Sequence, residues 1–318
     1  MRNKKDTDQL NIKAPTLLGD VLMFTKMRLA SLVVFSAFVT YITAVYFYST
    51  NYDPTIMIDW TKVCWLSLGG FLITAGSNGF NQIIEKDLDK LMTRTCNRPL
   101  PTGRMTLGAA WLISLFCGIS GTLILWFLLN PLTGVLGLAS LISYSIIYTP
   151  LKQKTPWAVF VGAFPGAAPP LIGWVAFEAS LDFTGSWVVS PAALSLFCLQ
   201  FMWQFPHFWA IAWRCHNDYK NAGFHLLPSS EGKDLKSAFQ ILLYTIFMIP
   251  ISLLPCHPEF NIGGFSSAII ILAFGGIMLY PAFMLFKTLS DKWATKLMFA
   301  SFIYLPLVLL ALLCNQLF

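Results

Sequence analysis

Residues 64–104 of the chain read CWLSLGGFLITAGSNGFNQIIEKDLDKLMTRTCNRPLPTGR. The first part, residues 64–84, is an apolar run long enough to cross a bilayer, which takes about 20 residues as a helix. The second part, from Asn81 to Arg104, holds three carboxylates and five cations in a chain that is only 11% charged. Charged groups are costly to keep at the edge of a membrane-spanning bundle. The segment therefore predicts a membrane helix that leads into a functional site.

Similar apolar runs follow one another along the whole chain. With 56% hydrophobic residues and a mean hydropathy of +0.64, the 318 residues are typical of a polytopic membrane protein. The runs of spanning length predict an all-α bundle of nine transmembrane helices. Their ranges are 29–48, 64–84, 106–127, 132–149, 157–177, 188–213, 237–255, 266–286 and 297–317. Residues 1–28 are interpreted as a cytoplasmic N-terminal segment and residues 29–318 as a single transmembrane domain.

The distribution of Lys and Arg predicts the orientation, because these residues mark cytoplasmic loops. A cytoplasmic N-terminus puts 20 of the 21 Lys and Arg residues on the cytoplasmic side and leaves only Lys62 outside. The acids of the predicted outer loops are Asp53, Asp59, Glu178, Asp182 and Glu259. With nine spans, the C-terminus is then periplasmic. Since the basic residues are dispersed over five loops, the net charge of +6 reflects membrane orientation, and no nucleic-acid partner is expected.

The composition of the N-terminal segment helps to predict the cellular location of the protein. It has neither the long apolar core nor the small-residue cleavage site of a secretory signal. Asp6 and Asp8 are unlike a mitochondrial transit peptide, which is poor in acids. A bacterial plasma membrane is therefore the expected location.

The acids after the second predicted span have helical spacing. If that helix continues past the membrane, Asn81, Glu85 and Asp89 lie within about 80° of one another on one face. Such oxygen ligands suit Mg²⁺, which keeps several waters and is completed by substrate phosphates. Asp87 is rotated by about 200° from Glu85, so it either faces away or belongs to an unwound loop.

Arg94, Arg98 and Arg104 follow these acids directly. Guanidinium groups bind phosphate in a bidentate manner. Acids that hold a metal next to arginines that hold phosphate predict a metal–diphosphate site. The alternative is a cytoplasmic loop whose acids merely pair with its bases.

Two more loops on the predicted cytoplasmic side carry polar residues. The loop between the sixth and seventh spans contains Arg214, His216, Asp218, Tyr219 and Lys220. The loop between the fourth and fifth spans contributes Tyr148, Lys152 and Lys154. Cations from three loops can surround one polyanion, although dispersed surface charge remains the alternative for the lysines.

The fifth and sixth predicted helices have unusual compositions. The fifth contains Gly162, Pro165, Gly166, Pro169, Pro170 and Gly173. These residues are expected to break or kink it, which is tolerated at membrane depth where the backbone is packed in protein or lines a cavity. The sixth places Gln204 and His207 in an aromatic stretch. A neutral imidazole there can ligate a heme iron, and a hydrogen-bonded core histidine is the alternative.

Several of these residues form recognisable motifs. They are Asn81-x-x-x-Glu85-x-Asp87-x-Asp89, Met92-x-Arg94-Thr95-x-Asn97-Arg98-Pro99-Leu100-Pro101-x-Gly103-Arg104, Tyr148-Thr149-Pro150-Leu151-Lys152, Gly166-Ala167-Ala168-Pro169-Pro170-Leu171-Ile172-Gly173-Trp174, Trp203-Gln204-x-Pro206-His207-Phe208, Asp218-Tyr219-x-x-Ala222-Gly223 and Leu226-Leu227-Pro228. With these motifs the chain resembles the UbiA-type intramembrane prenyltransferases over nearly its full length. Within them it resembles the branch that farnesylates heme.

The chain departs from the family pattern at three places. Glu85 stands where Asp is usual, and Asp218 is the only acid in residues 214–230. The Lys-Arg pair of the family appears as Lys152-Gln153-Lys154. The single acid near residue 218 favours the heme branch over the quinone-making relatives and leaves a second metal site open.

The resemblance implies a reaction and its participants. A farnesyl group would pass from farnesyl diphosphate to a vinyl group of heme b, with addition of water, to give heme o and diphosphate. The implied cofactor is Mg²⁺, with Mn²⁺ as the alternative, and heme b is a substrate. The implied surroundings are the lipid bilayer, and a heme a synthase or a terminal oxidase would receive the product.

The resemblance also distributes roles among the candidate residues. The catalytic candidates are Asn81, Glu85, Asp89, Lys152 and Asp218, and the metal ligands are Asn81, Glu85, Asp87, Asp89 and Asp218. The substrate-binding candidates are Arg94, Arg98, Arg104, Tyr148, Lys154, Gln204, His207, Arg214 and Tyr219. Two other functions stay open, a prenyltransferase for an aromatic quinone precursor and a polytopic transporter. A transporter would be expected to show inverted repeats and polar residues at the membrane midplane, and neither is evident.

Overall fold

The structure is a computed structural model that describes residues 16–179 and 189–317. These residues form helices and connecting loops, without a strand. Residues 1–15, which make up about half of the predicted N-terminal segment, lie outside the described residues. So do residues 180–188, which include Asp182 of a predicted outer loop.

Each predicted span coincides with a helical stretch of the structure. These stretches are α2 (Met27–Asn51), α3 (Trp60–Ile84), α5 (Leu107–Leu128), α6 (Pro131–Ile142) with its continuation through η1 (Ser143–Tyr148) and α7 (Thr149–Leu151), α8 (Ala158–Glu178), α9 (Pro191–Arg214), α11 (Leu235–Ser252), α12 (Phe265–Thr288) and α13 (Asp291–Leu317). Helix α4 (Lys86–Asp89) is the continuation past the membrane that the spacing of Asn81, Glu85 and Asp89 requires, and η2 (Leu254–Cys256) begins within the span predicted over residues 237–255. The sequence did not predict α1 (Leu17–Phe24) and α10 (His216–Asn221).

Among the described residues, eight helical stretches are long and apolar enough to cross a membrane. The long helix outside this group is α9, in which Gln200, Gln204 and His207 lower the hydropathy. It nevertheless packs against α8, α11 and α13. The prediction of an all-helical, multi-pass membrane protein is confirmed. The ninth span and the cytoplasmic N-terminus stay predictions.

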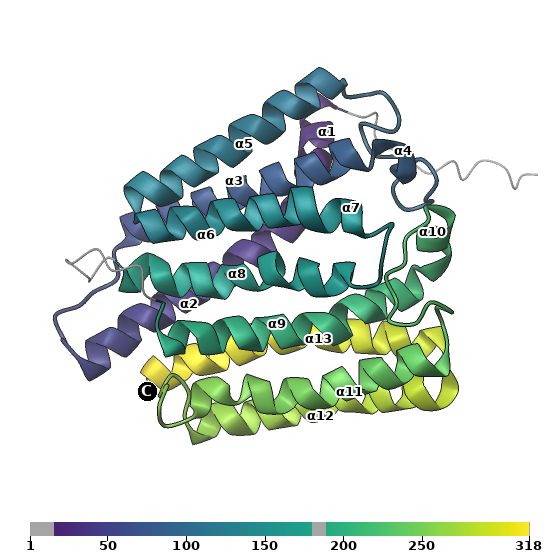
Figure 1. The fold of residues 1–318 in the computed structure, drawn as a ribbon. Helices are drawn as coiled ribbons and strands as arrows, with labels where there is room; N and C mark the ends of the chain where they lie inside the picture. Colours follow the sequence, from purple (N-terminus) through teal and green to yellow (C-terminus); the bar gives the residue numbers. More distant parts are fainter. Residues whose placement is uncertain (1–15, 180–188, 318) are drawn as a thin grey trace, which may run out of the picture.

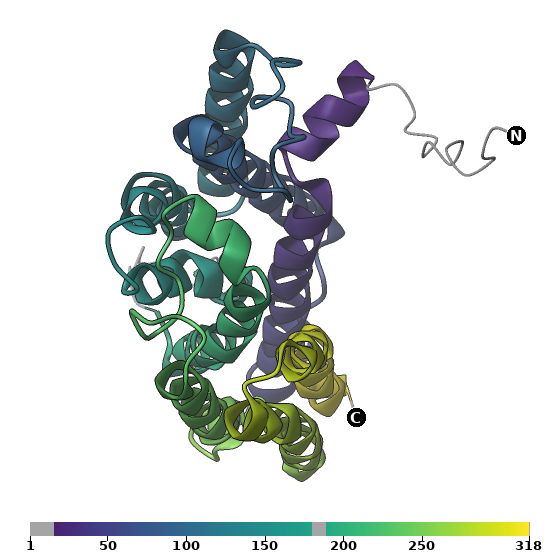
Figure 2. The same ribbon diagram turned by 90° about the vertical axis from the view of Figure 1, so that its right-hand side faces the viewer.

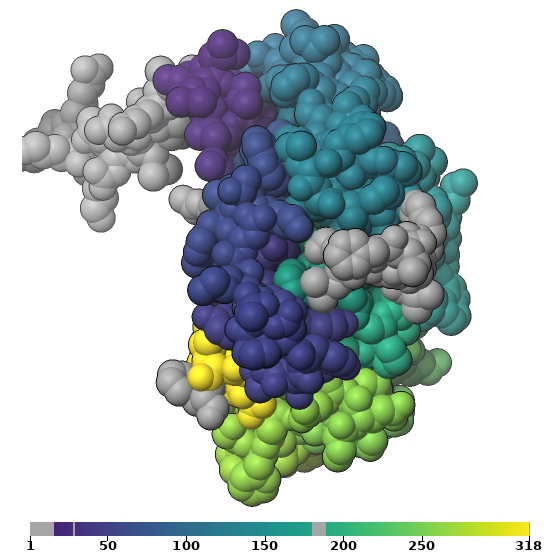
Figure 3. All heavy atoms as spheres, turned by 90° about the vertical axis from the view of Figure 1, so that its left-hand side faces the viewer, coloured from purple at the N-terminus to yellow at the C-terminus, as the bar shows by residue number. Residues whose placement is uncertain are grey.

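The long helices lie side by side, and their connections gather at the two ends of the bundle (Figure 1). One end carries α4, α7 and α10, and α1 lies near it, whereas the C-terminus lies at the other end. Figure 2 looks at the first end, with α10 in front of the bundle. Figure 3 shows the opposite end, where the connection between α2 and α3 lies beside the last residues of α13.

Helix α8 lies at the centre of the bundle, in contact with α2, α6 and α9. Its expected break is not seen, because α8 is continuous from Ala158 to Glu178. A proline removes the N–H that would bond the carbonyl four residues earlier, so Pro170 leaves the carbonyl of Gly166 free. The side-chain Nε2 of Gln200 on α9 donates to this carbonyl at 2.7 Å. A neighbouring helix therefore satisfies the backbone group that the proline exposes.

The span predicted over residues 132–149 contains a π-helical turn. This turn, η1, runs from Ser143 to Tyr148 between α6 and α7. Its wider helical turn accommodates one extra residue. The rings of Tyr144 and Tyr148 lie 5.2 Å apart, and the hydroxyl of Thr149 donates to the carbonyl of Tyr144 at 2.8 Å. The turn leads directly into α7 and Lys152.

Helix α1 is held against the end of α3 and against Arg104. Phe24 is fully buried, and its carbonyl accepts a hydrogen bond from Nε2 of Gln82 at 2.5 Å. Asp20 is also buried and pairs with Arg104, whose Nε lies 3.0 Å from Oδ1. These contacts fix the chain just before α2 begins.

Candidate active site

Asn81, Glu85 and Asp89 lie together at one end of the bundle, as their spacing predicts. Helix α3 ends at Ile84 and α4 begins at Lys86, but the helical hydrogen bonds continue across the junction. The amide of Glu85 bonds the carbonyl of Asn81 at 3.0 Å, and the amide of Asp89 bonds that of Glu85 at 2.8 Å. The three side chains therefore share one face. They are 2%, 4% and 0% exposed.

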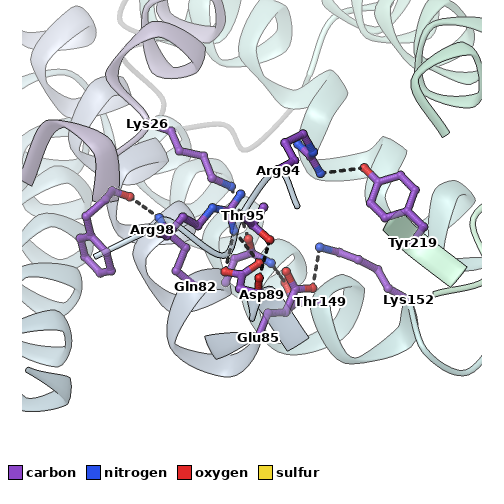
Figure 4. Close-up of polar contacts among 12 residues, drawn as sticks. Lys26, Gln82, Glu85, Asp89, Arg94, Thr95, Arg98, Thr149, Lys152 and Tyr219 are labelled. Atoms are coloured by element: carbon purple, nitrogen blue, oxygen red, sulfur yellow. Dashed lines mark hydrogen bonds and ion pairs between the residues drawn. The ribbon is translucent and has the colours of Figure 1, made fainter. Parts of the chain in front are cut away.

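Each of the two buried carboxylates has a cation beside it. Nη1 of Arg98 donates to both carboxylate oxygens of Asp89, at 2.8 and 2.7 Å. Nζ of Lys152 lies 2.7 Å from Oε1 of Glu85 and 4.7 Å from the centre of the Tyr148 ring. Figure 4 shows how these pairs bring the loop after α4 and the loop after α7 to the end of α3. Burial raises the pKa of the Asp89 carboxyl group, against the opposing effect of Arg98.

Lys26 also belongs to this site, whereas the sequence predicted no more than a cytoplasmic charge at this position. Its Nζ donates to Oδ1 of Asn81 at 3.4 Å, and its backbone is left-handed, with φ 49° and ψ 53°. A lysine rarely adopts this conformation, which is a form of strain that clusters at functional sites. Burial, reinforced by Arg98 and Lys152, lowers the pKa of Lys26 to about 7. A lysine before a span is common to many membrane proteins, so the sequence carried no distinctive signal.

We call these residues the charged cluster: Lys26, Asn81, Glu85, Asp89, Arg98 and Lys152. With Lys26 protonated, its three cations exceed its two carboxylates, so the cluster is net positive. Nδ2 of Asn81 also donates to the hydroxyl of Thr149 at 3.2 Å. The charged cluster thus joins α2, α3, α4 and the end of α7.

The short helix α10 contacts the segment that follows α4, and its Asp218 binds groups of that segment instead of lying beside the other predicted metal ligands. Its carboxylate accepts hydrogen bonds from the Thr93 hydroxyl at 2.5 Å and from the amide of Arg94 at 3.3 Å. The hydrogen bond from Thr93 is the main cause of the lowered pKa of Asp218. Nη2 of Arg94 donates to the Tyr219 hydroxyl at 3.3 Å. Asp218 therefore fixes the backbone of the loop that follows the acids.

The structure leaves other predicted site residues apart from the charged cluster. The carboxylate of Asp87 is 70% exposed and pairs with Lys90 at 2.8 Å. Arg104 binds Asp20, as described above, and Lys154 and Arg214 are exposed. Among the described residues, no three His, Cys, Asp or Glu side chains are grouped so that they could hold a metal ion. Asn81, Glu85 and Asp89 are thus the part of the predicted ligand set that comes together.

A cavity of about 320 Å³ lies inside the bundle, next to the charged cluster, whose six residues are not part of its wall. Tyr148 both contacts Lys152 and lines the cavity, which joins the two regions. Helices α2, α3, α6, α8, α9 and α13 supply a mostly apolar wall. Asn78 is a buried polar member of this wall, and its Nδ2 has no hydrogen-bond partner among the described residues. Such an unpaired donor is costly unless something binds to it.

Gln204 and His207 also line the cavity. Nε2 of Gln204 donates to the carbonyl of Ala163 at 2.9 Å. Nδ1 of His207 lies 2.7 Å from the hydroxyl of Ser301. The imidazole stacks on Trp203, with ring centres 4.5 Å apart. His207 is therefore hydrogen-bonded, as a core histidine would be, and also lies at the wall of the cavity.

The comparison with known families agrees with this arrangement. The sequence pattern described as "UbiA prenyltransferase family" matches residues 37–304, which is most of the chain. The chain belongs to the UbiA prenyltransferase family. The expectation of a membrane-embedded prenyltransferase is confirmed, and no observation favours the transporter.

Individual relatives are similar over most of their length. The protoheme IX farnesyltransferase of Cytophaga hutchinsonii is 44% identical over 296 residues, which cover 92% of this chain and 96% of the relative. The protein of the same name from Christiangramia forsetii is 45% identical over 298 residues and 92% of both chains.

Solved structures of the UbiA type share the fold at lower identity. A digeranylgeranylglyceryl phosphate synthase has a TM-score of 0.73 at 19% identity and covers 94% of this chain and 98% of its own. A UbiA homolog from Archaeoglobus fulgidus, solved with DMAPP and Mg²⁺, has a TM-score of 0.57 at 17% identity and covers 93% and 99%. These likenesses show that the helical arrangement is that of the family.

Proposed function

We propose that this chain transfers the farnesyl group of farnesyl diphosphate to a vinyl group of heme b, with addition of water, giving heme o and diphosphate. The names of the relatives that are 44% and 45% identical support this substrate pair. The observation that carries the proposal is the charged cluster beside an apolar cavity, with Tyr148 in contact with both, and with His207 in the cavity wall. The charged cluster suits a diphosphate, and the cavity around His207 suits a porphyrin.

Arg98 and Lys152 of the charged cluster would bind the diphosphate in place of part of their contacts with the two carboxylates. Arg98 and Lys152 are held by Asp89 and Glu85, which lie one helical turn apart on the same face, so both cations are fixed at this end of α3. A diphosphate entering there would share these donors and add Lys26, whose protonation it would favour. Fixed donors aimed at a departing group stabilise the charge that develops as the allylic C–O bond breaks.

The oxygen atoms of Asn81, Glu85 and Asp89 fit a hard cation. Mg²⁺ is commonly held by one or two carboxylates, several waters and the phosphates of a substrate, and Mn²⁺ accepts similar ligands. Two buried carboxylates and one amide match this pattern, and the described residues supply no third acid beside them. A family member from Archaeoglobus fulgidus was solved with DMAPP and Mg²⁺. When bound, the ion would supply neutralising charge for the diphosphate.

The apolar cavity would receive the farnesyl chain. Its wall excludes water from the allylic centre, which limits premature capture of that centre. The vinyl carbon of heme b would attack this centre, and water would then capture the cation next to the porphyrin. We assign heme b to the part of the cavity lined by Gln204 and His207, with the diphosphate of the other substrate at Tyr148 and Lys152.

The proposal includes the membrane in which the protein lies and the face at which the charged cluster is found. We place the charged cluster at the cytoplasmic face of a bacterial inner membrane, because 20 of the 21 Lys and Arg residues fall on that side of the predicted topology. Heme o would then pass to a heme a synthase or a terminal oxidase. The hydrophobic product can reach such a partner without leaving the bilayer.

The test is to incubate the purified chain in lipid nanodiscs with farnesyl diphosphate, heme b and Mg²⁺. Mass spectrometry should show heme b gaining one farnesyl group and one hydroxyl group, as a vinyl group becomes hydroxyethylfarnesyl, with release of one diphosphate per product. The same reaction with 4-hydroxybenzoate in place of heme b serves as the control. A prenylated benzoate with unchanged heme would reject the proposal in favour of a quinone pathway.

A further inference from the structure

Ser301 on α13 is the hydrogen-bond partner of His207 among the described residues. Its Oγ lies 2.7 Å from Nδ1 of His207 and 2.7 Å from the carbonyl oxygen of Met298. Ser301 itself is fully buried. The other ring nitrogen of His207, Nε2, makes no hydrogen bond with a described residue.

These contacts determine where the proton of a neutral imidazole resides. A serine hydroxyl has one proton, which it can give either to Met298 or to Nδ1. If it went to Nδ1, the imidazole proton would lie on Nε2 and would have no acceptor. If it goes to Met298, Nδ1–H donates to Ser301 and every donor is satisfied. The hydroxyl of Ser301 donates to the carbonyl of Met298, so its oxygen can only accept from Nδ1–H. The second arrangement is therefore favoured, and Nε2 keeps a free lone pair.

The orientation of the ring is also fixed. Nε1 of Trp203 donates to the backbone carbonyl of Ser301 at 2.9 Å. The Trp203 ring stacks on the imidazole at 16° between planes, and Phe302 packs edge-on with ring centres 4.8 Å apart. Helices α9 and α13 thus hold the imidazole from both sides and through its Nδ1.

We propose that Ser301 is a positioning residue that holds His207 in the tautomer whose Nε2 ligates the iron of heme b. The inference rests on heme b being a substrate of the cavity, as proposed above. A ligating histidine generally donates its other ring N–H to a second group, which fixes the ring and increases the basicity of the ligand. Here the hydroxyl of Ser301 is the second group, which accepts the hydrogen bond from Nδ1–H. Ligation would hold the porphyrin at one depth and so present one vinyl edge to the farnesyl chain.

The experiment measures the iron–imidazole bond. The full chain in nanodiscs is titrated with heme b, reduced, and examined by resonance Raman spectroscopy. We expect an iron–imidazole stretching band in the wild type and none in His207→Ala. Ser301→Ala should retain the band at lower frequency and weaken heme binding about tenfold, because Nδ1–H loses its acceptor. Ser301→Thr, which restores a hydroxyl, should recover the wild-type frequency.

A matched control is available on α9. Ser195 is buried, and its hydroxyl donates to the carbonyl of Ala192 at 2.7 Å, outside the cavity wall. Ser195→Ala should leave the band and the heme affinity unchanged. An unshifted band in Ser301→Ala would reject the role of Ser301, and a retained band in His207→Ala would reject the ligand itself.

Failure of this inference can be told apart from failure of the proposed function. A wild type that forms heme o but shows no iron–imidazole band keeps the function and rejects the ligation. A wild type that shows the band but forms no heme o from farnesyl diphosphate keeps the ligation and rejects the function.

Discussion

The charged cluster beside the cavity and the cavity wall around His207 hold their polar groups by different means. At the charged cluster, ion pairs link carboxylates to cations, and Lys26 adds a further positive charge. At His207, two neutral hydrogen bonds connect the imidazole to the hydroxyl of Ser301 and this hydroxyl to the backbone carbonyl of Met298. Ion pairs tolerate a change of partner when another charged group enters, whereas a chain of neutral hydrogen bonds fixes direction. The charged cluster is thus suited to a group that arrives and departs, and the wall around His207 to a group that must be oriented.

We expect the largest effect from Asp89→Asn. The amide keeps the size of the side chain but removes a buried anion, so heme o formation should fall about a thousandfold or more. The protein should remain in the membrane. Activity is measured by mass spectrometry of the heme product. Asp87→Asn is the matched control, since this exposed carboxylate pairs with Lys90 outside the charged cluster, and its activity should stay within about threefold. Equal losses in the two variants would contradict the metal-site assignment.

Lys152→Gln should reduce turnover about a hundredfold, because the departing diphosphate loses a fixed cation. The change also leaves Glu85 buried without its partner, which is destabilising. Thermal unfolding of the same variant measures the loss of stability separately from the loss of turnover. Lys154→Gln is the control, as Lys154 is exposed two residues away. Similar turnover in the Lys152 and Lys154 variants would show that surface charge alone matters.

His207→Ala should affect one substrate and spare the other. We expect the dissociation constant of heme b to rise about tenfold, with that of farnesyl diphosphate unchanged within about twofold. Isothermal titration with each substrate separately measures both values. If both affinities fell equally, or neither fell, His207 would be a core histidine without a role in heme binding.

The smallest effect concerns pH. Because the pKa of Lys26 is lowered to about 7, the free protein loses this positive charge as the pH rises from 6.5 to 8.5. The KM for farnesyl diphosphate should therefore rise about threefold over that range, relative to the permanently charged Lys26→Arg. Steady-state kinetics of the two proteins in the same buffers provide the comparison. Parallel pH profiles would remove Lys26 from the diphosphate site.

The sequence predicted the helices well because hydrophobic runs of spanning length have few other structures available in a membrane. The register from Asn81 to Asp89 was also predictable, since the helical spacing survives the junction at Glu85. Composition alone could not show that α8 stays continuous. That depends on Gln200, which comes from another helix and bonds the carbonyl freed by Pro170.

Sequence patterns could not predict the contacts between segments that are distant along the chain. Arg104 and Arg98 stand in one motif, yet Arg104 binds Asp20 of α1 and Arg98 binds Asp89. Lys26 and Ser301 belong to no recognised motif, and they acquire a role only from the packing of α2 against α3 and of α13 against α9. Spacing along one helix is readable from a sequence, but the partner that a neighbouring helix supplies is not.

The π-helical turn at Ser143–Tyr148 absorbs one residue within this span. Loss of one residue inside the turn would return it to α geometry, and the helix after it would keep its phase, so Lys152 would still face Glu85. Loss of one residue from the α-helical part of the span, in α6, would instead rotate the two parts of the span relative to each other by about 100°. Lys152 would then turn away from Glu85 although no residue of the charged cluster had changed. The same deletion therefore has opposite consequences for the diphosphate site on the two sides of Ser143.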